Sequence, residues 1–363
     1  MSDAGMAVLH FWWAWCTAAG GQVCVLAVVV LLADWFLTGR GWTGLRSTLW
    51  LLVLAKLVLP PTLTSPVSLA RLLPDAGGAV PAVAAAAEPA GPGWPVALFA
   101  LWSAGVVTLA GAGGIRLVRV RRRLLAGALP AAPEVREEAQ RAAALLGLRT
   151  LPRVVVSAAV RTPCVLGGWR PFVVLDPALA AAPGTARLRH ALLHELGHVR
   201  RGDPWWALVV AAVHCVWWFH PVAWLAARRL GLLRELGCDA LVARLLGPER
   251  DAYRRTLLTT ARPWIEGHPA AGHGLVHQHA DLLQRLTALA RPPSVRSRAQ
   301  RLAAALGVLA LLFCCVPLAR PAAPRIPPLA DLQGCLQVRY AVLAQLAASA
   351  PDSPVRGVTR EPR

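Results

Sequence analysis

Four apolar runs restrict what this chain can fold into. They cover residues 7–37, 48–69, 94–115 and 302–319. Each run approaches the roughly 20 residues that a helix needs to cross a bilayer. The first is too long for a signal peptide and lacks a basic start, so we expect it to stay in the protein as a membrane helix. The sequence therefore predicts an α-helical membrane protein with about four transmembrane helices.

Arginine residues give these helices a direction. Arginines follow the first and third apolar runs and precede the fourth, at positions 40, 46, 116, 119, 121–123, 291, 296, 298 and 301. The positive-inside rule places such residues in the cytoplasm and the loop 70–93 outside. We therefore expect three transmembrane helices with short loops in 1–120 and a cytoplasmic domain in 121–301. A fourth helix in 302–319 and a short extracytoplasmic tail in 320–363 complete the predicted topology.

The strong positive charge has two possible meanings. The formal net charge is +19 at pH 7, and a basic excess is one mark of nucleic-acid-binding proteins. No nucleic-acid-binding motif accompanies it, so we assign the excess to the positive-inside rule and to a surface that faces lipid headgroups. The expected partner is the lipid bilayer, with no direct contact to nucleic acid.

A lysine, Lys56, interrupts the second apolar run. An ionisable residue inside a membrane helix is by default a functional candidate. Two other interpretations stay open. The side chain can reach the headgroups by snorkelling, or it can form an ion pair with Asp34 at the end of the first run.

The stretch HALLHELGHV contains a His-Glu-x-x-His pattern. Residues four apart share one face of a helix, so His194 and His198 can bind one Zn²⁺ together. Glu195 is then placed to act as the catalytic base on the metal-bound water rather than as a ligand. The alternative is a helix with incidental histidines. Histidine and glutamate are uncommon inside apolar helices, which favours the metal site.

A candidate third ligand lies in the stretch RELGCDA, where Glu235 and Asp239 share a helical face. Glu235 can complete a His₂Glu site for one zinc ion, with the fourth position open. Asp239 and Asp203 are expected to hold a ligand imidazole through its other nitrogen. The eight cysteines include no CxxC pair, so we expect no cysteine-rich metal site.

The apolar stretch between these motifs must turn back. If residues 205–226 crossed the membrane, His194 and Glu235 would lie about 30 Å apart on opposite sides. Pro221 cannot continue a preceding helix undisturbed. The flanking segments 205–219 and 221–235 have 15 residues each, or about 22 Å of helix. We therefore expect an apolar hairpin over 205–235 that brings Glu235 level with the histidines.

The rest of the domain indicates a mixed fold. Residues 134–148 have a helical period, and 153–176 predict two or three strands around a Gly-Gly turn. Residues 185–202 predict a helix with Thr185 as its N-cap. Strands followed by a helix that bears the histidine pair suit an α+β zinc peptidase domain.

Together these motifs resemble the BlaR/MecR-type membrane zinc metallopeptidases, a family of antirepressor and signal-transducer peptidases. The resemblance runs roughly from residue 5 to 319 and rests on HELGH with Asp203 beyond it, WFHPVAW, RELGCD, TPCVLGGWRPFVVL, YRRTLL and LQRLTAL. It implies a gluzincin-type domain between the third and fourth membrane helices, on the cytoplasmic side of the bacterial inner membrane. His194, His198 and Glu235 would be its zinc ligands and Glu195 its catalytic base.

The best-known members of this family also carry an extracellular penicillin-binding domain, and they cleave themselves and a cytoplasmic repressor. About 44 residues follow residue 319 here, so we expect the peptidase half without the penicillin-binding sensor domain. The favoured hypothesis is a membrane-embedded zinc endopeptidase that cleaves itself, a cytoplasmic transcriptional repressor, or both, in response to a signal. The alternatives are an HtpX/CAAX-type quality-control or processing metalloprotease and a non-catalytic signalling scaffold. Whether the protein forms a homodimer stays open.

Overall fold

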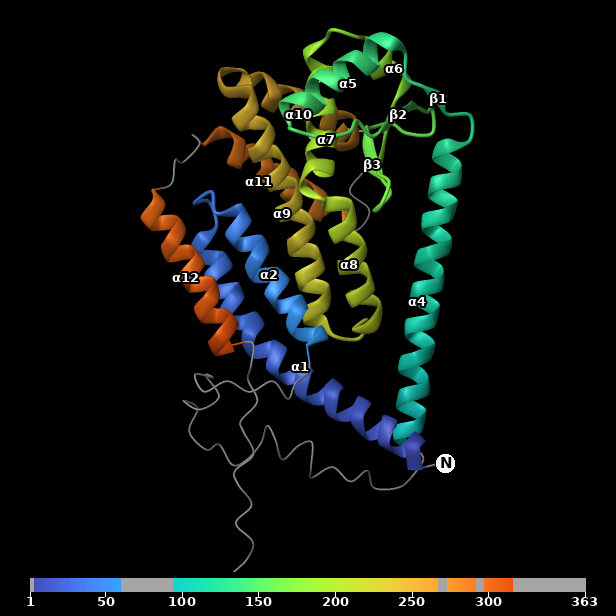
Figure 1. The fold of residues 1–363 in the computed structure, drawn as a ribbon, viewed down its shortest axis with the longest axis vertical. Coiled ribbons are helices and arrows are strands. Elements are labelled where there is room, and N and C mark those ends of the chain that lie inside the picture. The colour runs from blue at the N-terminus through green and yellow to red at the C-terminus, as the bar shows by residue number, and fades with distance from the viewer. Residues whose placement is uncertain (1–2, 60–93, 267–272, 292–296, 316–363) are drawn as a thin grey trace, which may run out of the picture. The chain divides into compact units, whose positions relative to one another are not determined.

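The computed structural model describes residues 3–59, 94–266, 273–291 and 297–315. The chain divides into two units, and all of the described residues lie in the first, Met1–Arg320. The fold described below is that of the first unit (Figure 1). The predicted outer loop, the predicted tail and the end of the predicted fourth membrane helix lie outside the described residues.

Helices are present where the apolar runs predict them. They are α1 (Asp3–Leu37), α2 (Thr43–Val58), α4 (Trp94–Leu125) and α12 (Arg298–Cys315). Within the described residues, two helical stretches are long and apolar enough to cross a membrane: Val8–Leu37, in α1, and α4. This supports a helical membrane protein. The count of four spans stays a prediction, because α2 has only 16 described residues and α12 does not meet the same test.

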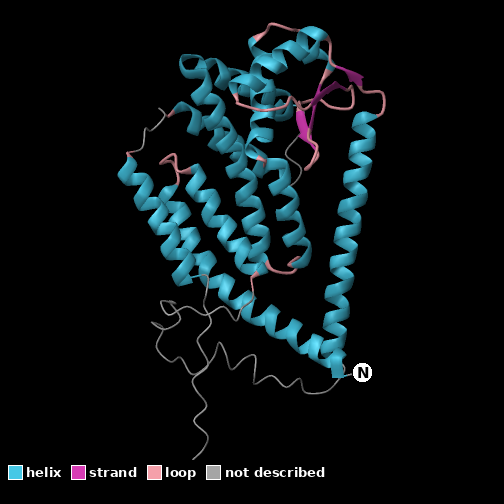
Figure 2. Ribbon diagram, in the orientation of Figure 1, coloured by secondary structure: helices cyan, strands magenta, loops and turns pink. Residues whose placement is uncertain are grey.

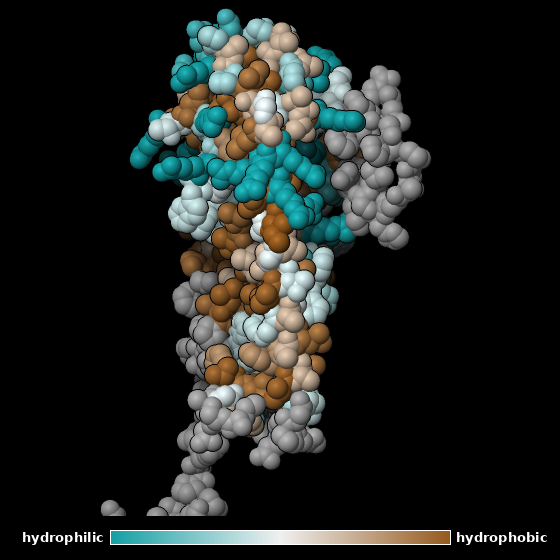
Figure 3. Space-filling model, turned by 90° about the vertical axis from the view of Figure 1, so that its right-hand side faces the viewer, coloured by the Kyte–Doolittle hydropathy of each residue, from teal (hydrophilic) through white to brown (hydrophobic). Residues whose placement is uncertain are grey.

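Much of the apolar surface of α4 is not covered by protein. None of the residues in its most apolar window is buried, and Leu101 and Val107 are among its exposed side chains. A helix on a soluble protein turns its apolar stripe toward the core. An uncovered apolar helix instead suits contact with lipid tails. Figure 3 shows apolar residues over the lower part of this face and hydrophilic residues over the upper part.

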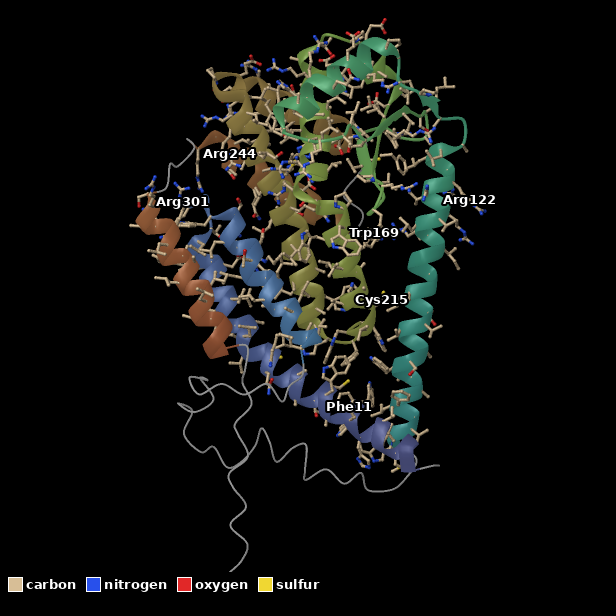
Figure 4. All side chains as sticks on the ribbon, in the orientation of Figure 1. Phe11, Arg122, Trp169, Cys215, Arg244 and Arg301 are labelled. Carbon is tan, nitrogen blue, oxygen red and sulfur yellow. The ribbon has the colours of Figure 1, made fainter. Side chains whose placement is uncertain are left out.

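Labelled side chains follow the same division. Figure 4 places Arg122, Arg244 and Arg301 in the upper half of the view. Cys215 and Phe11 lie in the lower half, with Trp169 between the two groups. The three labelled arginines thus lie above the labelled Cys215 and Phe11 in this view.

A small mixed sheet stands beside the helices of that domain (Figure 2). Its strands are β1 (Leu129–Pro130), β2 (Arg153–Val156), β3 (Cys164–Leu166) and β4 (Phe172–Leu175), in the order β1-β2-β4-β3. Strand β4 runs parallel to β2 and antiparallel to β3. All of β4 is buried, which explains its unbroken apolar sequence FVVL. Strand β3 is left as an edge of the sheet.

The helices of this domain pack around one apolar core. They are α5 (Pro133–Leu145), α6 (Pro177–Ala180), α7 (Ala186–Arg201), η2 (Gly247–Glu249), α10 (Arg250–Glu266) and α11 (His273–Ala290). Val173 and Leu175 of the sheet meet Leu188, Leu192 and Leu196 of α7 in this core. One stripe of α7 is thereby anchored, which fixes the direction of its other faces.

The stretch after α7 forms a helical hairpin. Helix α8 (Asp203–Val216) and helix α9 (Pro221–Leu246) are joined by a short turn. Gly202, with a φ of 71°, lets the chain leave α7 and enter α8 at once. Pro221 occupies the first turn of α9, where its missing N–H is harmless. The chain therefore turns back as the spacing requires, and α9 continues beyond Glu235 to Leu246.

A buried ion pair joins the membrane helices to α9. Arg46 Nε of α2 donates to Asp34 Oδ1 of α1 at 2.6 Å, and Arg229 of α9 lies 3.8 Å from Oδ2. Asp34 thus pairs with Arg46, so the suggested pairing with Lys56 is wrong. Lys56 is fully buried, and its ammonium has no hydrogen-bond partner among the described residues.

Replacing Asp34 with asparagine is expected to lower the free energy of unfolding by about 3–5 kcal/mol, because Arg46 would stay buried without its counter-charge. Chemical unfolding of the purified protein in detergent measures this. The control is Glu249→Gln, which breaks a pair with Arg189 whose side chains are 42% and 54% exposed. That change should cost less than about 1 kcal/mol. Equal losses in the two variants would contradict a structural role for the buried pair.

Candidate metal centre

Helix α7 presents His194 and His198 on the side away from its anchored stripe. The Oγ1 of Thr185 accepts a hydrogen bond from the Leu188 N–H at 3.4 Å, so the helix begins with the predicted N-cap. His194 and His198 lie one turn apart and face α9, which packs against α7. Glu195 lies between them in sequence and is buried.

Three donor groups converge between α7 and α9. The Nε2 atoms of His194 and His198 are 3.2 Å apart. The Glu235 carboxylate lies 3.5 Å from His194 Nε2 and 3.7 Å from His198 Nε2. Donor atoms bound to a tetrahedral zinc ion lie about 3.4 Å from one another. The structure thus brings the three predicted ligands together at the spacing that one metal ion requires.

The other nitrogen of each imidazole is hydrogen-bonded, that of His198 to an aspartate and that of His194 to a tyrosine. His198 Nδ1 donates to Asp203 Oδ2 at 2.8 Å. His194 Nδ1 donates to the Tyr253 hydroxyl at 2.9 Å, and that hydroxyl donates to Asp239 Oδ1 at 2.6 Å. Such contacts fix the tautomer and leave Nε2 free to bind a metal. Asp203 and Asp239 therefore lie where the sequence predicts them, although Asp239 reaches its histidine partly through Tyr253.

Two residues of the site were missed by the reasoning from spacing. Tyr253, on α10, makes the link just described. Arg285, on α11, donates to both oxygens of Asp239 at 2.7 and 2.9 Å and lies 3.3 Å from Glu235. Both fall within the stretches YRRTLL and LQRLTAL, which carry the family resemblance. That likeness was the available signal, since no local spacing relates either residue to the histidines.

Cys238 is a further donor that the cysteine pattern did not predict. Among the described residues, its Sγ forms a cluster with one nitrogen each of His194 and His198, all within 4.8 Å of one another. The thiol donates to the backbone oxygen of His194 at 3.1 Å and is fully buried. Glu235 is instead 31% exposed at its side chain and lines the cleft. We therefore still expect the carboxylate to be the third ligand, with the thiol filling the contact between α7 and α9.

The helices approach so closely there that position 197 has no room for a side chain. A Cβ on Gly197 would lie 2.8 Å from Cys238 Sγ. A residue with a side chain at this position would have to displace the Cys238 thiol. The glycine of HELGH is thus part of the geometry that gathers the donors.

Burial and neighbouring charges shift the pKa values of Glu195 and Glu235 in opposite directions. Burial raises the pKa of Glu195, and the two neighbouring histidines offset only part of this. Burial also acts to raise the pKa of Glu235, but the hydrogen bond and charge of His194 outweigh it, so the pKa falls to about 2. Burial acts to lower the pKa of His198, but the hydrogen bond to Asp203 acts to raise it. The result is a pKa of about 9, above the ordinary value for histidine. Glu235 is therefore held ionised, whereas Glu195 is suited to exchange a proton.

A cleft of about 300 Å³ opens onto the donors. His194, Glu195 and Glu235 line it from one side, and the loop before β3 contributes Thr162 and Pro163. His190 also reaches the cleft, but its Nδ1 is bonded to Thr256 Oγ1 at 2.8 Å. The cleft gives a substrate access to the metal centre next to the edge of the sheet.

The third ligand can be identified by paired substitutions. Glu235→Gln should weaken metal binding by more than about tenfold, because a neutral amide replaces a charged donor. Cys238→Ser should change it much less, since the thiol is bonded to a backbone carbonyl. Elemental analysis after dialysis against a graded series of chelator concentrations measures both. The opposite order would identify the thiolate as the third ligand.

Comparisons with known proteins identify the family to which the chain belongs. A family model described as BlaR1 peptidase M56 matches residues 10–289. The chain is also similar to the regulatory protein BlaR1 of Bacillus licheniformis, with 26% identity over 87 residues. That alignment covers 24% of this chain and 14% of the relative. The family match extends over most of the chain, from α1 to the end of α11, and includes every residue of the metal centre. The chain therefore belongs to the BlaR1 peptidase M56 family of metallopeptidases.

Proposed function

We propose that this protein is a membrane-embedded, zinc-dependent endopeptidase with a regulatory role. The observation that carries the proposal is the convergence of His194, His198 and Glu235, with 3.2–3.7 Å between their donor atoms. Two imidazoles and one carboxylate form a ligand set of catalytic zinc sites, which keep a fourth position open. A non-catalytic scaffold would not need the buried base Glu195 beside such a set.

His194, His198 and Glu235 would hold one Zn²⁺. When bound, the ion would polarise the scissile carbonyl and lower the pKa of a water molecule. Asp203 and Tyr253 orient the two imidazoles through their Nδ1 atoms. The charge of Arg285 stabilises Glu235 and Asp239 as anions.

Glu195 is the proposed general base and acid. It adjoins His194 on α7 and lines the cleft, so it faces the space that a peptide bond would occupy. The pKa of Glu195 is raised by burial, so it lies closer to neutral pH than the pKa of an exposed carboxylate. Glu195 would accept a proton from the attacking water and then donate it to the departing amine.

Strand β3 would position an extended substrate. It is the edge of the sheet, and it packs beside α7 at the cleft. An edge strand has unpaired backbone groups, to which a peptide can add as a further strand. Binding through backbone groups would align a scissile bond with the metal centre and depend little on the side chains of the substrate.

The proposed substrates are more specific than the peptidase chemistry alone. We propose that the protein cleaves itself, a cytoplasmic transcriptional repressor, or both, in response to a signal. The regulatory name of the Bacillus licheniformis relative supports this, although the alignment covers a small share of that protein.

We also propose that the domain lies between the third and fourth of four membrane helices and faces the cytoplasm of a bacterium. The uncovered apolar surface of α4 and the arginines at its end support this placement.

Glu195→Gln should abolish peptide hydrolysis while the metal content stays unchanged. The expected loss is about 10²–10⁴-fold, which is the usual contribution of a general base. Immunoblots of self-cleavage products and of a co-expressed candidate repressor give the activity, and elemental analysis gives the metal. Glu134→Gln, at an exposed position on α5, is the control and should leave both unchanged. Undiminished cleavage in Glu195→Gln would refute the enzymatic proposal.

Reporter fusions test the proposed orientation. Alkaline phosphatase should be active when fused within 70–93 and inactive when fused near residue 150 or 248, because that enzyme folds only outside the cytoplasm. A fluorescent protein that folds in the cytoplasm should give the opposite pattern at the same three sites. Active phosphatase at residue 248 would place the metal centre outside the cell and overturn the assignment.

A further inference from the structure

A second and larger cavity, of about 540 Å³, opens between α2, α8 and α9. Residues of α8 that recur every three or four positions line it from Asp203 to His214, and one face of α9 lines it from Ala227 to Arg234. Such spacings trace a single stripe along each helix. The cavity is therefore a groove parallel to the helices. On α8 it spans 11 residue steps, 203 to 214, or about 16 Å.

The groove is polar at one end and apolar along its length. Arg201, Asp203 and Arg234 lie at the end nearest the metal centre, while Leu51, Val210 and Leu230 line the part beyond. Asp203 is engaged by His198 and by Arg201 Nε at 2.8 and 3.0 Å, so its charge is already shared. No hydrogen bond or ion pair is recorded for Arg234 within the described residues. The open end thus offers net positive charge.

Glycines shape both parts of the groove. A Cβ on Gly237 would come within 2.5 Å of the Arg201 guanidinium, so this glycine lets Arg201 lie against α9. A Cβ on Gly231 would meet nothing within 4 Å, because that position faces open space in the groove. One glycine places a cation at the polar end, and the other leaves room in the apolar part.

We propose that this groove binds one anionic phospholipid. Its phosphate would lie between Arg201 and Arg234, since guanidinium groups bind phosphate oxygens in a bidentate manner. One acyl chain would follow the apolar stripes of α8 and α9 toward His214. Basic pockets between membrane helices on the cytoplasmic side are known to recognise lipid headgroups. A zwitterionic lipid would bring a cation of its own close to the two arginines, so the site should prefer an anionic headgroup.

The proposed lipid would touch the support of the metal centre. Arg201 contacts Asp203, and Asp203 holds the imidazole of His198. The headgroup would therefore be connected to a proposed metal ligand, His198, through Arg201 and Asp203. The proposal of a lipid site stands independently of catalysis, because it rests on the groove, on its arginines and on the proposed membrane placement.

Native mass spectrometry of the full chain in neutral detergent tests the proposal. The lipids are phosphatidylglycerol and phosphatidylcholine, with inorganic phosphate as a third arm. The wild type should retain one phosphatidylglycerol, and Arg234→Gln should reduce its retention about tenfold through the loss of a charged hydrogen bond. Arg244→Gln, an exposed arginine of α9 outside the groove, is the matched control and should behave as the wild type.

Gly231→Leu gives a second, charge-neutral test. Leucine should occupy the groove and reduce retention, and it favours the helical state over glycine, so folding should be preserved. Thermal unfolding checks each variant, and if one is unfolded, the other decides. Equal retention of phosphatidylcholine, displacement of the lipid by inorganic phosphate at equal concentration, or unchanged retention in the folded variants would each overturn the lipid site. None of these readouts requires metal or peptidase activity, so failure here leaves the proposed function untouched.

Discussion

The meeting of two imidazoles and one carboxylate between α7 and α9 is the constraint on which the rest of this structure depends. His194 and His198 come one turn apart from a single helix, but Glu235 must be delivered by another helix. The chain achieves this by a hairpin that leaves at Gly202 and returns from Pro221. Close approach then requires Gly197, because Cys238 occupies the space where a side chain would project.

The buried ionisable groups of the site need partners from the helices that pack around it. Asp239 is fully buried and accepts hydrogen bonds from Tyr253 and from two nitrogens of Arg285. A buried charge without such partners would cost several kcal/mol. Helices α10 and α11 are thus needed by the site as well as by the core. A similar pair, Asp34 with Arg46, ties α1 to α2 at the other side of α9.

Local patterns predicted the parts of the site whose relation is set by helix geometry. The four-residue spacing of His194 and His198 and the equal arms around Pro221 each follow from the rise and turn of a helix. Contacts between distant segments were harder to predict. Tyr253 and Arg285 have no fixed spacing from the histidines. The suggested pairing of Asp34 with Lys56 was wrong, because Arg46 and Lys56 both lie on α2 and their spacing does not tell which of them Asp34 meets.

The sequence by itself determined the apolar helices, the histidine pair with its base, and the need for a return before Glu235. These follow from periodicity, length and covalent connection, which the order of residues carries directly. Only the tertiary structure decided that the Tyr253 hydroxyl links His194 to Asp239 and that Cys238 lies beside the donor atoms. It also decided that a groove lies between α2, α8 and α9. Such contacts depend on how helices pack in three dimensions, and many packings are compatible with the same periodic pattern.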